Sequence, residues 1–453
     1  MAKTRVSGRD RPPVSPDSRQ QAKAGTRTLQ GNALRSAVAE PADLLPLQLF
    51  FLAAAVFVVS AGYGSLLPLL PAWIAQQSPG ASPAEVSRHV GFLSGAYTGG
   101  VLVGAPIWGL ISDRLGRPRI LIVGLIGYVT SLLLLLLPSM SGLWAIYGLR
   151  TAAGLFVAAV VPIVPALVAA HTPAAVRARR FAWLGAASLL GFLFGPGLIA
   201  LANAVGSLIV EGPGLVALST RIVIVLAALL GAGMMLGLAL TLPPRVDTPK
   251  AATAEPGHRD RASLVGLWLL SVVVNFVLSG FELGIVLQGR QHADSTTQEI
   301  ALMFAECSLV MLGVNAILFF TSLLDEVSPR MVITAGSLIG VSGLALLGLH
   351  QSIEWMFIGI SLTSAGTGLV LPVISFLAAG ASRRSLGATM GSLASAAGLG
   401  QTLGSSAGGW LFGALAQLAF GWLALPLVAT LILLLSRPSW WAATGPAARA
   451  SSA

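Results

Sequence analysis

The 453-residue chain has few charged side chains, one cysteine and no long polar insert, and each scarcity excludes a class of protein. Asp, Glu, Lys and Arg together make up only 10% of the residues, whereas hydrophobic residues make up 55% and the mean hydropathy is +0.83. A water-soluble domain of this composition would expose large apolar patches. The sequence therefore predicts an all-α membrane protein with many transmembrane helices, and it leaves little room for a separate soluble catalytic domain.

Sites for metals, ATP and catalysis are missing as well. Cys307 is the only cysteine, so no internal disulfide can form. No cluster of His, Cys and acidic residues has metal-ligand spacing, and His171 and His350 fall at predicted helix ends, where solvation explains them. No glycine loop ending in Lys-Ser or Lys-Thr is present to hold ATP phosphates, and no paired nucleophile and base is apparent. We expect no metal, no cofactor and no enzymatic activity, so an ion gradient or the substrate's own gradient would supply the energy.

The net charge of +10 would suggest nucleic acid as a partner if the chain were soluble, but its distribution argues against that. Eight of the 27 Lys and Arg residues precede residue 45, and most of the others fall in alternate short loops. Because such loops stay in the cytoplasm, we expect both termini to be cytoplasmic in a plasma (inner) membrane protein. Residues 1–44 are predicted to be a disordered basic tail, which either binds acidic headgroups or only fixes the topology.

Twelve apolar spans follow the tail, in two sets of six. The predicted domains are an N-terminal bundle at 45–242, a cytoplasmic linker at 243–262, a C-terminal bundle at 263–437 and a tail at 438–453. The spans lie near 46–71, 90–110, 119–138, 142–168, 181–204, 219–242, 263–287, 299–323, 331–349, 353–379, 387–413 and 415–436.

The stretch GLISDRLGRPR, residues 109–119, places one acid and three arginines between two apolar spans. An acid at a helix end beside arginines can form charge-assisted bonds in one state of a moving protein and release them in another. The alternative is that the arginines are only a topology signal.

This pattern resembles the loop between helices 2 and 3 in the major facilitator superfamily, with the signature Gly-x-x-x-Asp-Arg-x-Gly-Arg-Arg/Lys. The resemblance implies two pseudo-symmetric six-helix bundles that alternate in access, and a conformational switch in this loop. Pro118 replaces a residue that is often basic in the family. The matching positions are Gly109, Asp113, Arg114, Gly116, Arg117 and Arg119.

An internal duplication supports two related halves. Residues 150–154, RTAAG, align with residues 362–366, LTSAG, at an offset of 212, and Asp113 finds Asp325 at the same offset. Parallel repeats of this kind let transporters place a site near the midplane between the halves.

Arg150 is the most unfavourable residue to place in lipid, since an arginine at a helix centre costs roughly 2.5 kcal/mol or more. Its position resembles that of the helix 4 arginine linked to proton coupling in this superfamily, although an arginine near the boundary can also snorkel to water. Buried acids are the usual partners, and Glu282 and Glu306 are the two that lie inside apolar spans. Either acid can carry a proton or be a fixed structural group.

Tyr63 and Asn275 are further candidates for coupling or for lining a cavity. Tyr63 belongs to a break at Ser60–Pro68 in the first span, which the alternative explains as close packing of small residues. The first span carries no acid, unlike that of many drug/proton antiporters which this chain resembles, so the coupling route is left open.

Glycines in the fifth and eleventh spans predict close helix approaches that act as pivots. The fifth span contains Gly-x-x-x-Gly-Pro, a pattern associated with antiporters in the superfamily, and Pro196 permits a bend. The eleventh span has the complementary glycines, with Ser405 in the proline's place. The pivot candidates are Gly191, Gly195, Pro196, Gly197, Gly400, Gly404 and Gly408.

The resemblance implies a secondary active transporter, and the fifth-span glycines imply proton-driven efflux of small apolar or cationic compounds by a monomer in the bilayer. Two alternatives stay open: an uptake symporter or uniporter of the same fold, and a membrane sensor or scaffold that transports nothing.

Overall fold

The structure is a computed structural model that describes residues 44–140, 142–172, 174–210, 212, 214–242, 258–289, 297–321, 327–350, 352–381 and 386–436. Residues 1–43 of the predicted tail at 1–44, the predicted tail at 438–453, residues 243–257 of the predicted linker and Asp325 lie outside these residues. Every regular element among the described residues is helical. The prediction of an all-α protein is thereby confirmed.

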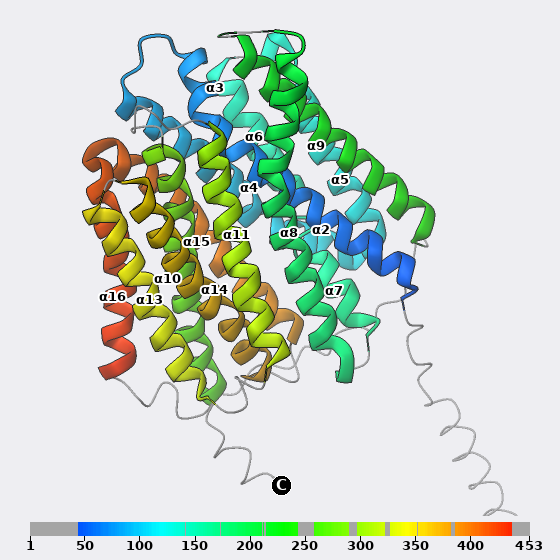
Figure 1. Cartoon of the computed structure of the whole chain (residues 1–453). Coiled ribbons are helices and arrows are strands. Elements are labelled where there is room, and N and C mark those ends of the chain that lie inside the picture. The colour runs from blue at the N-terminus through cyan, green and yellow to red at the C-terminus, as the bar shows by residue number, and fades with distance from the viewer. Residues whose placement is uncertain are drawn as a thin grey trace, which may run out of the picture. The chain divides into compact units, whose positions relative to one another are not determined.

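The first half of the chain runs from α2 to α9 (Figure 1). Within it, α2 packs on α8 and α9, α4 packs on α6, and α5 packs on α6 and α9. The elements are α2 (Pro46–Leu66), η1 (Leu67–Leu69), α3 (Leu70–Gln77), α4 (Pro83–Leu115), α5 (Arg117–Leu134), η2 (Pro138–Met140), α6 (Leu143–Val157), α7 (Ile163–Ala170), α8 (Ala174–Ser207) and α9 (Gly214–Thr241).

The second half, from α10 to α16, repeats this plan beside the first (Figure 1). Here α10 packs on α15, α13 packs on α14 and α16, and α11 packs on α14, while α4 with α15 and α8 with α11 join the two halves. The elements are α10 (His258–Gly289), α11 (Thr297–Phe320), α13 (Pro329–Leu349), α14 (Ile353–Ala381), α15 (Leu386–Leu415), η3 (Ala416–Leu418) and α16 (Ala419–Ser436).

The described helices supply twelve membrane crossings, as predicted. Ten stretches are long and apolar enough to cross a bilayer; one of these, Gly391–Ser436, contains both α15 and α16, and the shorter α6 continues through α7 as a further crossing. We call the end at which α4 joins α5 the loop end. Since each crossing reverses direction, α2 starts and α16 finishes at the loop end, and α4 starts at the opposite end.

Two crossings are interrupted at prolines. The fourth was predicted as one span over 142–168, but the helix stops after Val157 and resumes at Ile163. Pro162 cannot donate a backbone hydrogen bond. Just before it, the Ala159 amide donates to the carbonyl oxygen of Phe156 at 3.0 Å rather than to that of Leu155, and the Leu155 carbonyl instead accepts from the Trp108 indole at 2.7 Å. In the first crossing the predicted break appears as the single 3₁₀ turn η1 around Pro68.

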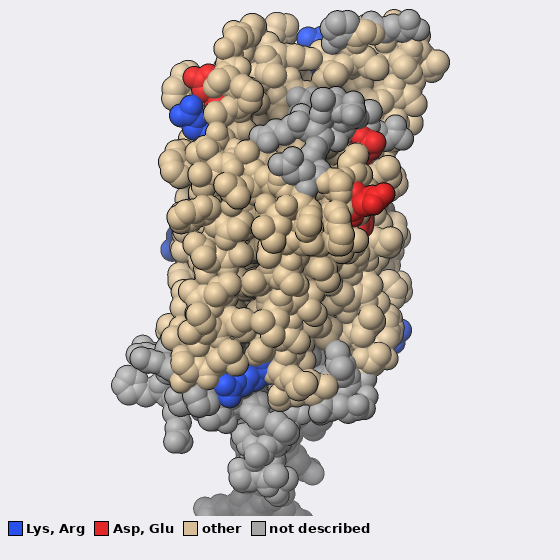
Figure 2. Space-filling model, turned by 60° about the vertical axis from the view of Figure 1, so that its left-hand side comes forward, with Lys and Arg blue, Asp and Glu red and all other residues tan. Residues whose placement is uncertain are grey.

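The outer surface of the helices is apolar. Figure 2 shows a face that is tan over most of its area, with charged side chains in a few small groups. Large hydrophobic side chains on many helices remain exposed, Leu110, Leu229 and Ile432 among them. In a helical membrane protein such side chains contact acyl chains, whereas most of the buried hydrophobic residues form one continuous core.

Candidate functional site

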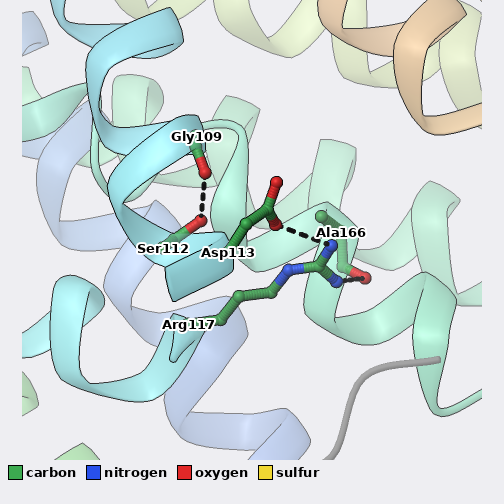
Figure 3. Close-up of polar contacts among 5 residues, drawn as sticks. All are labelled: Gly109, Ser112, Asp113, Arg117 and Ala166. Carbon is green, nitrogen blue, oxygen red and sulfur yellow. Dashed lines mark hydrogen bonds and ion pairs between the residues drawn. The ribbon is translucent and has the colours of Figure 1, made fainter. Parts of the chain in front are cut away.

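The predicted switch loop is a tight joint between α4 and α5. Gly116 has φ +93°, a backbone conformation that side chains other than glycine rarely adopt, and this residue both ends α4 and precedes α5. Asp113, on the last turn of α4, pairs with Arg117 at 3.9 Å, and the Arg117 guanidinium also donates to the carbonyl oxygen of Ala166 at 3.1 Å (Figure 3). The loop is thereby tied to α7.

The remaining loop candidates make less contact. Arg114 and Arg119 are exposed. A Cβ placed on Gly109 would meet nothing within 4 Å, so packing does not require a glycine at this position. The Gly109 carbonyl oxygen accepts a hydrogen bond from the Ser112 hydroxyl at 2.8 Å. The structure therefore brings together Asp113, Gly116 and Arg117, leaves Arg114 and Arg119 at the surface, and places Gly109 half-buried on α4.

Arg150 points into the first half of the protein rather than to the surface. It is only 1% exposed, and its guanidinium carbon lies 4.8 Å from the centre of the Tyr97 ring, in a cation–π contact. Tyr63 and Tyr128 also lie near it. Among the described residues, its Nε and Nη2 atoms have no hydrogen-bond partner.

Tyr63 is the second ring in a row of four aromatic rings that crosses from one half to the other. Its ring stacks on Tyr97 of α4 at 5.3 Å and lies 5.9 Å from Phe192 of α8. Phe192 in turn lies 5.7 Å from Phe304 of α11. Arg150 contacts Tyr97 at one end of this row, and Phe304 of the second half forms the other end.

Glu282 is the acid of the second half that faces this row. It lies on α10, partly buried, and the Tyr63 hydroxyl is beside its carboxyl group and beside the Ser279 hydroxyl. Tyr97 therefore connects Arg150 to Tyr63, and Tyr63 lies beside Glu282. Among the described residues, Arg150 and Glu282 form no direct ion pair.

Asn275 lies two helical turns from Glu282 on α10 and is buried. Its side chain donates to the carbonyl oxygen of Ser271 at 2.9 Å and accepts from Gln401 of α15 at 3.3 Å. The next turn of α10 repeats this link, since the hydroxyls of Ser279 and Ser405 are 2.6 Å apart. A buried polar stripe thus runs along the contact between α10 and α15.

Glu306, on α11, forms the other end of the polar centre. One of its oxygens accepts a hydrogen bond from the Ser361 hydroxyl of α14, and the other, Oε2, is buried with no partner within the described part of the chain. Cys307 beside it is buried and close to both acids. The described residues contain no group of three or more His, Cys, Asp or Glu side chains that could hold a metal ion.

The pivot candidates pack helices within each half. A Cβ on Gly191 or Gly195 would collide with the backbone of α2, at Phe57 and at Gly64. On α15, Gly400 and Gly404 face the backbone of α10, and Gly408 also faces α10, while nothing lies within 4 Å of a Cβ on Gly197. Pro196 lies inside α8, which continues to Ser207.

A second glycine contact, which the sequence analysis missed, joins the two halves. A Cβ on Gly91 of α4 would lie 2.5 Å from the Cα of Gly409 of α15, and Gly95 and Gly413 make similar approaches to Ser406 and Ala84. We call this contact the α4–α15 seam. The four-residue spacing of Gly91 and Gly95 is the signal that could have shown it.

Tyr97 and Tyr128 were also missed. The chain has four tyrosines, and three of them gather around Arg150. In so apolar a sequence, tyrosines within spans are the obvious neighbours for a buried cation, and their rarity is the signal that could have identified them.

Comparisons with known proteins agree with this architecture. The class D tetracycline resistance protein of Salmonella ordonez is 28% identical over 396 residues, which cover 84% of this chain and 95% of that protein. The quinolone resistance protein NorA of Staphylococcus aureus is 25% identical over 151 residues, which cover 33% of this chain and 37% of that protein.

The fold is shared with a solved structure as well. The human organic anion transporter MFSD10 superposes with a TM-score of 0.66 at 20% identity, covering 86% of this chain and 100% of that one. A family model described as Major Facilitator Superfamily matches residues 52–318, more than half of the chain. The chain is a multi-pass membrane protein and belongs to the Major Facilitator Superfamily of transporters.

Proposed function

We propose that this transporter exports small, largely apolar or cationic compounds in exchange for protons, as a monomer in the plasma (inner) membrane. The observation that carries the proposal is the contact of Tyr63 with Glu282 across the two halves, with Arg150 next to the same tyrosine. An acid and a cation that share one polar neighbour across a moving interface can change partners as the halves move.

Glu282 is the proton carrier in this proposal. Its carboxyl group is held at the boundary between the halves, whereas Glu306 is bonded to Ser361 inside the second half. A protonated Glu282 leaves the Arg150 charge uncompensated, and a deprotonated one attracts it through Tyr63. Binding of a compound near this centre would then favour release of the proton.

We further propose that the loop end is cytoplasmic and that the described conformation is open toward it. The close approaches of α4 to α15 begin where Leu102 meets Gly398 and continue to where Ala84 meets Gly413. These contacts therefore lie on the part of α4 that is nearest the opposite end. The Phe192–Phe304 contact joins the halves as well. The arginines of the loop, Arg114 and Arg119, support a cytoplasmic placement.

Export rather than uptake is favoured by the relatives whose names state resistance to tetracycline or a quinolone. Tetracycline is therefore the first compound to test. Everted membrane vesicles with an imposed proton gradient should release protons when tetracycline is added, and Glu282→Gln should abolish the release at equal protein abundance. Glu299→Gln, at the end of α11, is the control and should release protons as the wild type does.

Two outcomes would contradict this proposal. If the wild type moves tetracycline at a rate that an uncoupler leaves unchanged, proton exchange is wrong and a uniporter is the better description. If no compound in a broad panel is moved while the protein is abundant in the membrane, the efflux proposal itself is wrong.

A further inference from the structure

We propose that Ser279 and Ser405 are positioning residues that link the proton affinity of Glu282 to closure of the α4–α15 seam. The proposal rests on the role proposed above for Glu282. It assigns a task to two serines that neither bind the compound nor carry the proton.

The two serines form a buried contact between neighbouring helices. Ser279 of α10 is 4% exposed, Ser405 of α15 is 1% exposed, and their hydroxyl oxygens are 2.6 Å apart. Ser279 lies one helical turn before Glu282, and the Tyr63 hydroxyl of α2 lies beside both. Four polar groups therefore follow one another: Ser405, Ser279, Tyr63 and Glu282.

Ser405 also takes part in the seam through its backbone. A Cβ on Gly91 of α4 would lie 2.7 Å from the carbonyl oxygen of Ser405, so α4 rests directly on this turn of α15. The same residue thus contacts the other half with its backbone and the polar centre with its side chain. Separation of α4 from α15 releases the turn of α15 that holds the Ser279 hydroxyl.

The direction of the hydrogen bonds determines the effect on Glu282. A hydroxyl group can donate one hydrogen bond and accept others, so Ser405 can donate to Ser279, Ser279 to Tyr63, and Tyr63 to the Glu282 carboxylate. Hydrogen bonds aligned in one direction strengthen one another and favour the charged form of the final acceptor. A closed seam therefore favours a deprotonated Glu282, and an open seam favours protonation from the opposite side.

Among the described residues, the other titratable and charged groups named near Glu282 come from three elements. Tyr63 belongs to α2, Cys307 and Glu306 belong to α11, and Arg150 of α6 lies near Tyr63. None of these residues is changed by substitution of Ser279 or Ser405. A shift in pH dependence after such a substitution would therefore report on the serine contact.

The test is the pH dependence of tetracycline-driven proton exchange in vesicles, for the wild type, Ser405→Ala, Ser279→Ala and Ser405→Thr. Both alanine variants should move the midpoint to higher pH by half a unit or more, because the carboxylate loses its aligned donors. Ser405→Thr keeps the hydroxyl and should have the same midpoint as the wild type. The matched control is Ser188→Ala, which breaks a similar serine pair with Ser60 at 2.9 Å between α8 and α2.

The proposal is overturned if the alanine variants exchange protons with the wild-type midpoint, or if Ser188→Ala shifts it equally. A lower rate at an unchanged midpoint also counts against it, since that is the result of looser packing alone. Should an alanine variant not reach the membrane, Ser405→Cys replaces it, because a thiol fills similar space but is only a weak hydrogen-bond donor, and it should likewise move the midpoint to higher pH. Absence of exchange in the wild type contradicts the proposed function instead.

Discussion

At the scale of single residues, the centre of the protein contains a buried cation, Arg150, that no acidic side chain pairs with in the part of the chain the structure describes. Arg150 lies over the ring of Tyr97 and near Tyr63 and Tyr128, which offer a π face and hydroxyl oxygens but no negative charge. A charge kept in such a place lowers stability, because removal from water is compensated only in part. Its presence is understandable if the cation acts in a step of transport.

Replacement of Arg150 by Gln separates these two effects. We expect proton exchange to fall at least about tenfold, equivalent to about 1.4 kcal/mol, while the melting temperature of the purified protein stays the same or rises. Arg221→Gln, which changes an exposed arginine of α9, should affect neither. A marked loss of stability in Arg150→Gln would instead show that the arginine is structural.

Gly116 is the second residue whose conformation matters by itself. Its φ of +93° strains any residue with a Cβ, at an order of 1–3 kcal/mol. We expect Gly116→Ala to lower the melting temperature by several degrees, as measured in detergent. Gly109→Ala, on the last turns of α4 with open space around it, should leave the melting temperature unchanged or raise it.

At the scale of elements, α15 presents glycines on two faces with different partners. Gly400 and Gly404 approach α10 within the same half, so they hold these two helices together as one body. Gly409 and Gly413 approach α4 of the other half. In the proposed transport cycle only the second face has to separate, so the two sets of glycines should respond differently to substitution.

A bulky side chain in the seam should open the opposite end. In Gly409→Leu the Cβ would come within 2.5 Å of the Gly91 Cα, so the closed contact cannot form as described. Cys307, the lone cysteine, is replaced by alanine first, and Ser406→Cys then reports on the seam. Labelling by a membrane-impermeant maleimide from the opposite side should rise about tenfold, equivalent to about 1.4 kcal/mol.

The control for this experiment is Gly233→Leu on α9, where nothing lies within 4 Å of an added Cβ. Equal labelling of Ser406→Cys with and without Gly409→Leu would mean that the seam does not set the conformation.

At the scale of the whole molecule, the fold could be predicted from hydropathy, whereas the site was harder to predict because it depends on the direction in which side chains point. Twelve apolar spans and alternating arginines follow from the cost of placing charge and bare backbone in lipid, so they can be read from sequence. The break in the fourth crossing was not predicted, because residues 158–162 are all apolar and hydropathy carries no information on the backbone hydrogen bond that a proline cannot donate.

The candidate site was predictable only in part, for a related reason. Arg150, Glu282 and Glu306 are conspicuous in apolar spans, but which residues face them depends on how the helices are rotated. Tyr97 and the seam glycines carry no charge, and their partners lie far away in sequence. Periodicity gives the face of one helix, whereas the pairing of faces between α4 and α15 comes from packing.

The loop between α4 and α5 is expected to influence which conformational state the transporter adopts. Asp113 is 69% exposed and its pair with Arg117 measures 3.9 Å, so the pair contributes little to stability, within about 1 kcal/mol. The Arg117 contact with Ala166 nevertheless ties α5 to α7 in the described conformation. Loss of the pair should therefore shift the balance between states rather than unfold the protein.

Asp113→Asn tests this at the level of the cell. Cells that express the wild type should tolerate more tetracycline than cells without the transporter, and Asp113→Asn should remove most of that advantage while membrane abundance and melting temperature stay near wild type. Asp113→Glu, which keeps the charge, should retain part of the advantage. Wild-type tolerance in Asp113→Asn would leave the loop as a topology signal only, since a neutral side chain there would then serve transport as well as a charged one.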